Sequence, residues 1–212
     1  MTNLNINNPF FRFMGKLGDL ILLNLVWLLC CIPVVTVGAS NTALFYVARK
    51  LAAGEEYRIF HDFFQALRQN WKQATATWLI LAPLGGLFLV DLIIGLYTGG
   101  AFGNVFRGIG AVLCVVWLMV EGYSFLLLAR YEYTVKQLLV HALFLSISNP
   151  TVTITSVALA VWLPLLMWKS LDIALYALPF WLLLGRAVSA VIVSALMLPV
   201  FRRLEAKKDG EL

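Results

Sequence analysis

The stretch from Leu17 to Lys50 constrains the fold more than any other part of the chain. Between residues 20 and 32, Asn24 is the one polar side chain. Extended back toward Pro9, this apolar block is long enough to cross the roughly 30 Å hydrocarbon layer, which takes about 20 helical residues. The block therefore predicts a membrane-spanning helix over residues 10–32.

A proline and a glycine divide the stretch in two. Pro33 lacks a backbone N–H and disfavours helix in the residue before it, so the first helix should end there. Gly38 closes the bend, and Ser40 is expected to cap a second helix over residues 36–53. We expect a helical hairpin with Pro33, Gly38 and Ser40 as its structural elbow, although one broken span is an open alternative. A signal peptide would also explain the apolar block, but we expect the segment to be retained.

The composition agrees with a membrane protein. Hydrophobic residues make up 61% of the chain and charged residues 13%, with a mean hydropathy of +0.87, whereas about a quarter of the residues in soluble proteins are charged. The net charge of +5 comes from cations that are scattered between apolar blocks. We therefore expect the lipid bilayer as the main partner and no nucleic-acid binding.

Later blocks extend this pattern along the whole chain. Apolar runs predict spans over residues 71–97, 105–129, 151–168 and 172–201, and amphipathic runs predict interfacial helices over 57–70 and 134–148. The expected fold class is all-α: a single polytopic domain over residues 1–212, with about six transmembrane helices and two interfacial ones.

Positive charges predict the orientation of the chain. With six spans and the N-terminus inside, thirteen cations face the cytoplasm, whereas Arg107 and Lys169 face outward and Arg186 lies within the membrane. If residues 20–48 formed one span instead, the count would be eleven against four. The positive-inside rule therefore favours six spans, with both termini on the cytoplasmic side of a bacterial plasma membrane.

Glu121 and Arg186 are charged residues at membrane depth. They lie about 17 and about 14 residues into two helices that run in the same direction, so their depths agree to within about one helical turn. We expect an ion pair. It either locks the two helices together or serves a carboxylate, phosphate or hydroxylated ligand.

Four more polar residues are secondary candidates. Asp91 and Arg107 are expected to form a salt bridge at the membrane rim, and Asn24 is expected to hydrogen-bond between helices. Asn41 is expected either to cap the second helix or to line a polar mouth.

The sequence carries no recognisable catalytic motif. We expect no enzyme activity, no catalytic residues, no metal and no cofactor. His61 and His141 lack the close spacing of metal ligands, and their role stays open. Three cysteines fall inside predicted spans and are expected to be free thiols: Cys30, Cys31 and Cys114.

The chain resembles the YesL family of bacterial integral membrane proteins. The signature residues are Asn24, Trp27, Pro33, Thr36, Gly38, Ala39, Thr42 and Ala43, and the segments Phe63–Trp78 and Phe125–Pro150 also fit. The resemblance implies a multi-pass protein without an established activity, whose genes often lie beside carbohydrate-uptake and sensor genes.

Two hypotheses about function follow from the resemblance and the polar residues at membrane depth. In the first, the protein assists or takes part in carbohydrate or solute uptake, with a transporter permease as its partner. In the second, it is a scaffold or signalling partner of a membrane sensor kinase. The substrate and the oligomeric state stay open.

Overall fold

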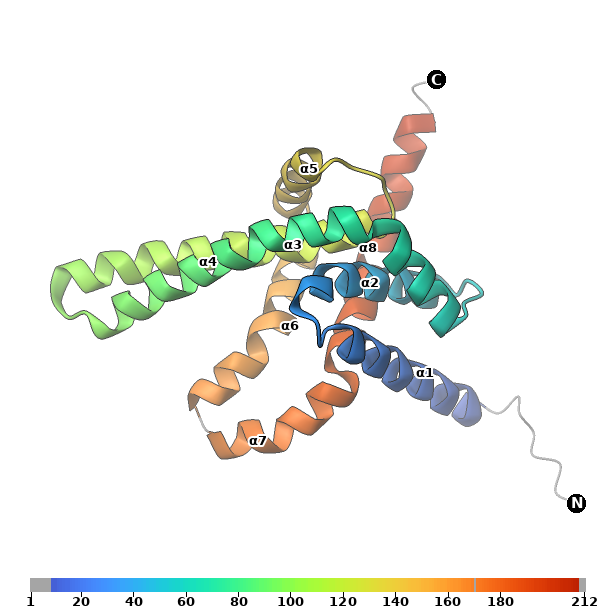
Figure 1. Ribbon diagram of the computed structural model, residues 1–212, viewed down its shortest axis with the longest axis horizontal. Coiled ribbons are helices and arrows are strands. Elements are labelled where there is room, and N and C mark those ends of the chain that lie inside the picture. The colour runs from blue at the N-terminus through green and yellow to red at the C-terminus, as the bar shows by residue number, and fades with distance from the viewer. Residues whose placement is uncertain (1–8, 170, 210–212) are drawn as a thin grey trace, which may run out of the picture.

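The protein is built of helices throughout the residues that the computed structural model describes, 9–169 and 171–209 (Figure 1). The expectation of an all-α fold is confirmed for these ranges. The elements are α1 (Pro9–Cys30), η1 (Val34–Thr36), α2 (Val37–Ala53), α3 (Ile59–Tyr97), α4 (Gly100–Leu128), α5 (Val135–Ser148), α6 (Pro150–Lys169), α7 (Leu171–Phe180), the π-helical turn η2 (Trp181–Gly185) and α8 (Arg186–Asp209).

Helix α2 forms the centre of the fold. It packs against α1, α3 and α8, and its residues from Gly38 to Phe45 are all buried. Several of these residues are small, which lets the neighbouring helices approach closely. Large side chains from the surrounding helices complete this core: Leu23, Phe63, Tyr123, Phe125, Met197 and Phe201.

Gly38 marks the closest approach between α2 and α3. A Cβ atom placed on Gly38 would collide with the backbone oxygen of Ala74 and would lie 2.7 Å from Trp78 Cβ. Backbone atoms cannot move aside as a flexible side chain can. The fold therefore requires glycine at this position.

We expect Gly38→Ala to lower the free energy of unfolding by about 1–3 kcal/mol, because overpacking a tight contact forces the two helices apart. Equilibrium unfolding in mixed detergent micelles measures the change. Gly18→Ala in α1 is the matched control, since a Cβ at Gly18 meets nothing within 4 Å. Equal stability of the two variants would contradict the role given to Gly38.

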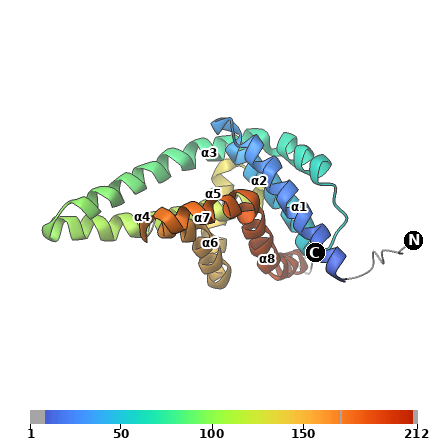
Figure 2. The ribbon, with the colours of Figure 1, turned by 90° about the horizontal axis from the view of Figure 1, so that it is seen from below.

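Helices α3 and α4 form a long hairpin, which we call the arm, that projects beyond the rest of the bundle (Figures 1 and 2). Glycines hold its two helices close together. Gly85 lies under the ring of Trp117, and Gly110 lies against the backbone of Leu92. The far part of the arm therefore has a small-residue seam inside and apolar side chains outside.

The predicted boundary between the interfacial helix 57–70 and the span 71–97 is wrong. Both belong to the single 39-residue helix α3, which is about 58 Å long. No glycine or proline lies between Ile59 and Ala82 to end a helix. Asn70 also fits within the helix, because its side chain donates to the Ala66 carbonyl at 3.2 Å.

The number of predicted spans is not confirmed. Among the residues that the structure describes, four helical stretches are long and apolar enough to cross a membrane: Phe13–Cys30, Ile59–Tyr97, Gly100–Leu128 and Leu175–Glu205. The pair α5 and α6, bent by 105°, makes a fifth if it counts as one broken span. Helix α2 falls short, because its 17 residues reach only about 26 Å.

The other predicted helices match the structure to different degrees. Helix α5 agrees closely with 134–148, because Thr134 and Gln137 form a capping box at its start. Helix α4 begins five residues before the predicted start of its span at residue 105. The span expected over 172–201 is instead α7, η2 and α8 in succession.

Candidate functional site

The polar centre of the bundle begins at Asn24, on the face of α1 that meets η2. Its amide nitrogen donates to the Leu182 carbonyl at 2.7 Å, and its amide oxygen accepts from the Ala187 N–H at 2.8 Å. These two backbone groups lie five residues apart, Leu182 within the widened π-helical turn and Ala187 just after it. The Asn24 side chain therefore bridges the opened backbone, and the expected interhelical hydrogen bond is confirmed.

Asn41 joins α1, α2 and α8 at the next position. Its side-chain oxygen accepts from Trp27 Nε1 at 3.0 Å and from Arg186 Nη2 at 3.5 Å. The residue is buried in the second turn of α2, so neither a capping role nor a place in a polar mouth is correct for it. Asn41 instead orients the guanidinium group of Arg186.

Arg186 and Glu121 face each other across this centre. Arg186 Nη2 lies 4.0 Å from Glu121 Oε1, and the two side chains are only 21% and 14% exposed. The guanidinium carbon also lies 5.8 Å from the centre of the Phe45 ring, within the range of a cation–π contact. Glu121 and Arg186 therefore approach each other, as their similar depths in the membrane predicted. A ligand-binding role for them stays a prediction.

The cavity beside this pair is small. It has a volume of about 30 Å³ and is lined by Glu121, Arg186, Ser156 and Ser189, among others. Such a volume holds about one water molecule. A sugar does not fit beside Glu121 and Arg186 in this conformation.

Asp91 and Arg107 both lie in the arm, but no ion pair joins these two described residues, so the expected rim salt bridge is wrong. Arg107 Nη2 donates to the Gly95 carbonyl at 3.4 Å instead. The Asp91 carboxylate points toward Gly110 on the facing helix, where a Cβ would lie 3.2 Å from Asp91 Oδ2. Each charged side chain therefore meets the backbone of the facing helix at a glycine, and the two do not meet each other.

The elbow lies where it was expected, but its side-chain hydrogen bonds satisfy the end of α1 and not the start of α2. Helix α1 ends at Cys30 and α2 begins at Val37. Ser40 is inside α2 and donates to the Cys30 carbonyl at 3.1 Å, and Thr36 donates to the same oxygen at 2.6 Å. Ser40 therefore satisfies the end of the first helix and does not cap the second. Pro33 lies within the turn, and Gly38 lies in the first turn of α2.

A second polar cluster, of which the sequence analysis singled out His61 alone, lies at the start of α3. Asp62 is buried and accepts from Lys50 Nζ at 2.8 Å and from the Arg58 N–H at 3.1 Å, and His61 Nδ1 lies 3.2 Å from its other oxygen. Beside it, Tyr57 donates to Asp19 on α1. Burial and this hydrogen bond raise the pKa of Tyr57 to about 12.

The Asp62 cluster makes the free energy of unfolding depend on pH in the acidic range. Burial alone would raise the pKa of Asp62, but the hydrogen bonds from Lys50, Arg58 and His61 outweigh it and hold the pKa below its usual value. A lowered pKa means that the ionised carboxylate stabilises the fold above the ordinary value of about 3.9, and that this contribution is lost as the pH falls through the folded-state pKa.

We expect Asp62→Asn to lower the free energy of unfolding by about 2 kcal/mol at neutral pH, because the charged hydrogen bond from Lys50 is lost. The gap to the wild type should close as the pH falls below about 4. Unfolding measured across a pH series tests this, with the exposed Glu56→Gln as control. A gap that stays constant with pH would rule out the ionised carboxylate as its cause.

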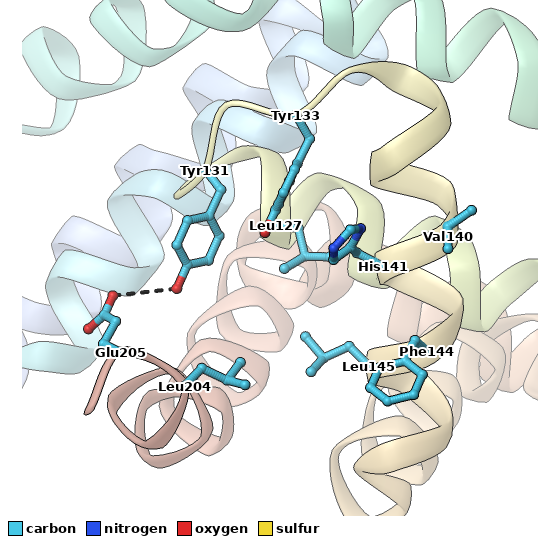
Figure 3. Close-up of a pocket in the computed structure, with 9 residues that line it drawn as sticks. All are labelled: Leu127, Tyr131, Tyr133, Val140, His141, Phe144, Leu145, Leu204 and Glu205. Atoms are coloured by element: carbon cyan, nitrogen blue, oxygen red, sulfur yellow. Dashed lines mark hydrogen bonds between the residues drawn. The ribbon is translucent and has the colours of Figure 1, made fainter. Parts of the chain in front are cut away.

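The two histidines lie in different surroundings. His61 is 68% exposed beside Asp62. His141 stacks on the ring of Tyr133, with centroids 4.9 Å apart (Figure 3). Within residues 9–169 and 171–209, no three histidine, cysteine or acidic side chains come together as metal ligands.

Comparison with known proteins gives a consistent picture. Residues 20–92 match the model of a family described as "Protein of unknown function, DUF624". The chain is also 24% identical over 212 residues to "Uncharacterized protein YesL" of Bacillus subtilis (strain 168), a match that covers 98% of this chain and 96% of that protein. No solved structure matches the chain. The family match over residues 20–92, the near full-length similarity and the apolar helices together support a membrane protein that is similar to YesL and whose function is not established.

Proposed function

We propose that this protein is an accessory subunit of carbohydrate or solute uptake, and that it binds the membrane helices of a transporter permease through the α3–α4 arm. The observation that carries the proposal is Asp91. It lies in an apolar part of the arm and makes no ion pair with any residue in the described part of the chain. A carboxylate at membrane depth is costly unless a polar partner faces it.

The rest of the arm supports the same role. Its outward side chains are large and apolar, among them Leu87, Val90, Ile94 and Phe102. Lipid would cover these side chains as well as a protein would, but lipid tails offer no partner to Asp91. A permease helix with a polar or basic side chain at the matching depth satisfies both requirements.

The small cavity at Glu121 and Arg186 supports an accessory subunit over a carrier. A carrier needs a cavity that fits its solute, whereas about 30 Å³ admits about one water molecule. We therefore give Glu121 and Arg186 a structural role in joining α4 to α8. In this proposal the uptake of solute passes through the partner chain.

The proposal places both termini in the cytoplasm of a bacterial cell. The start of α1 and the end of α8 lie on the side of the molecule away from the tip of the arm (Figure 1), and the positive-inside count favours the same orientation. The tip at Thr98–Gly99 then faces the outside of the plasma membrane.

Site-specific crosslinking combined with uptake measurement tests the proposal. A photoreactive residue at Val90 should crosslink to a permease in intact cells, and deletion of the gene should lower sugar uptake. Asp91→Asn should reduce both the crosslinking and the uptake, whereas the exposed Asp172→Asn is the matched control. Unchanged uptake over a panel of sugars would refute the accessory role, and crosslinks to a sensor kinase would favour the signalling alternative.

A further inference from the structure

Two hollows of opposite character lie side by side where α4 ends. The first, which we call the apolar hollow, has a volume of about 490 Å³ and lies between the ends of α4 and α8 and the helix α5 (Figure 3). Apolar side chains are the larger part of its lining, among them Leu127, Val140, Phe144 and Leu204. A mostly apolar lining suits a hydrocarbon chain.

The second, which we call the cationic hollow, lies between α3 and the segment that follows α4. It has a volume of about 640 Å³, and Arg68, Lys72 and Arg130 line it. Tyr131 lines both hollows. One side chain therefore separates a cationic space from an apolar one.

The charges of the cationic hollow are not balanced within it. Arg130 is occupied, because its Nε donates to Glu205 Oε1 at 3.1 Å. Arg68 and Lys72 are exposed and make no ion pair in the part of the chain that the structure describes. Glu132 is the only carboxylate among the lining residues. The two unpaired cations, Arg68 and Lys72, thus outnumber the single anion Glu132. The hollow therefore has a positive charge that a further negative group would balance.

The two hollows also lie at the level of lipid headgroups. Arg68 and Lys72 stand at the point where the charged first turns of α3 give way to its apolar part. Trp71, between them, lines the cationic hollow and is 52% exposed, and tryptophan is enriched at the membrane–water interface. Basic pockets at this level are suited to anionic headgroups.

We propose that the two hollows together bind one anionic glycerophospholipid, with its phosphate between Arg68 and Lys72 and an acyl chain against Phe144 and Leu204. A neutral lipid would leave the two cations without a partner. A free phosphate would leave the apolar hollow empty. A phospholipid with net negative charge satisfies both hollows with one molecule. The site lies at the end of the α3–α4 arm opposite the tip, more than 15 residues along α3 from Asp91.

Native mass spectrometry of the detergent-purified protein, titrated with phosphatidylglycerol or phosphatidylcholine, tests the headgroup contact. We expect the wild type to retain phosphatidylglycerol preferentially. Arg68→Gln with Lys72→Gln should weaken this retention about fivefold for each charge removed. Arg202→Gln with Arg203→Gln removes two exposed cations of α8 that do not line the hollow, and this control should retain the lipid as the wild type does.

A second variant tests the acyl-chain contact. Val140→Trp fills the apolar hollow from an exposed position and should lower phosphatidylglycerol retention several-fold, while soluble glycerol 1-phosphate should not displace the lipid. Equal retention of the two lipids, an equal loss in the Arg202 and Arg203 control, or displacement by glycerol 1-phosphate would each overturn the proposal. The last result would indicate a site for phosphate alone.

Discussion

Replacing Glu121 with leucine is expected to lower the free energy of unfolding by about 2–3 kcal/mol, because the largely buried guanidinium of Arg186 is left without its carboxylate. Arginine keeps its charge at any accessible pH, so it cannot avoid this cost by losing a proton. Arg186→Leu should cost less, since an isolated carboxyl group can be neutralised by a proton. Equilibrium unfolding in mixed micelles, with both single variants measured at the same pH, gives the comparison.

The double variant Glu121→Leu with Arg186→Leu serves as the control for this pair. With both charges removed, it should recover most of the stability that Glu121→Leu loses. A double variant no more stable than Glu121→Leu would show that the two side chains act separately. Single variants that fold like the wild type but abolish uptake would favour the ligand-binding hypothesis over the structural role.

Asn24→Leu is expected to cost about 2–5 kcal/mol, because it leaves the Leu182 carbonyl and the Ala187 N–H without partners in a setting that excludes water. Leucine has the same number of side-chain heavy atoms and the same branch at Cγ, so the main loss is that of the two hydrogen bonds. The rate of amide hydrogen exchange over residues 181–187 should rise by at least about tenfold, since the Asn24 side chain no longer bridges the π-helical turn.

The neighbouring Leu25→Ala is a suitable control for Asn24. Leu25 is 38% exposed, and its truncation should cost about 1 kcal/mol or less and leave exchange in η2 unchanged. If Asn24→Leu leaves both the stability and the exchange of this turn as they are in the wild type, the bridging role is wrong.

Local signals in the sequence predicted the ends of some helices well. Pro33 stops α1 within two residues of the expected position, and the amphipathic run over 134–148 predicted α5 to within one residue of its start. In each case, the signal lies within the helix or directly beside it. The approach of Glu121 to Arg186 could also be anticipated, because the rise per residue of a helix sets the depth of each side chain.

Features that depend on the relative placement of distant helices could not be predicted in this way. The partners of Asn24 are 158 and 163 residues away along the chain, and they are available only because the backbone widens at η2. The amphipathic pattern of residues 57–70 placed Asp62 on the polar face of an interfacial helix. In the structure, the close packing of α3 on α2 buries Asp62 against Lys50. Sequence periodicity gives the face of a helix but not which neighbour will cover it.

The central position of α2 has a consequence for biogenesis. Asn41 on α2 finds Arg186 145 residues later in the chain, so this contact cannot form until α8 has left the ribosome. At about 5–20 residues per second, α2 waits roughly seven to thirty seconds of translation for this neighbour. During that interval Ser40 and Thr42 already have their acceptors on Cys30 and Gly38, and Asn41 keeps only its hydrogen bond from Trp27.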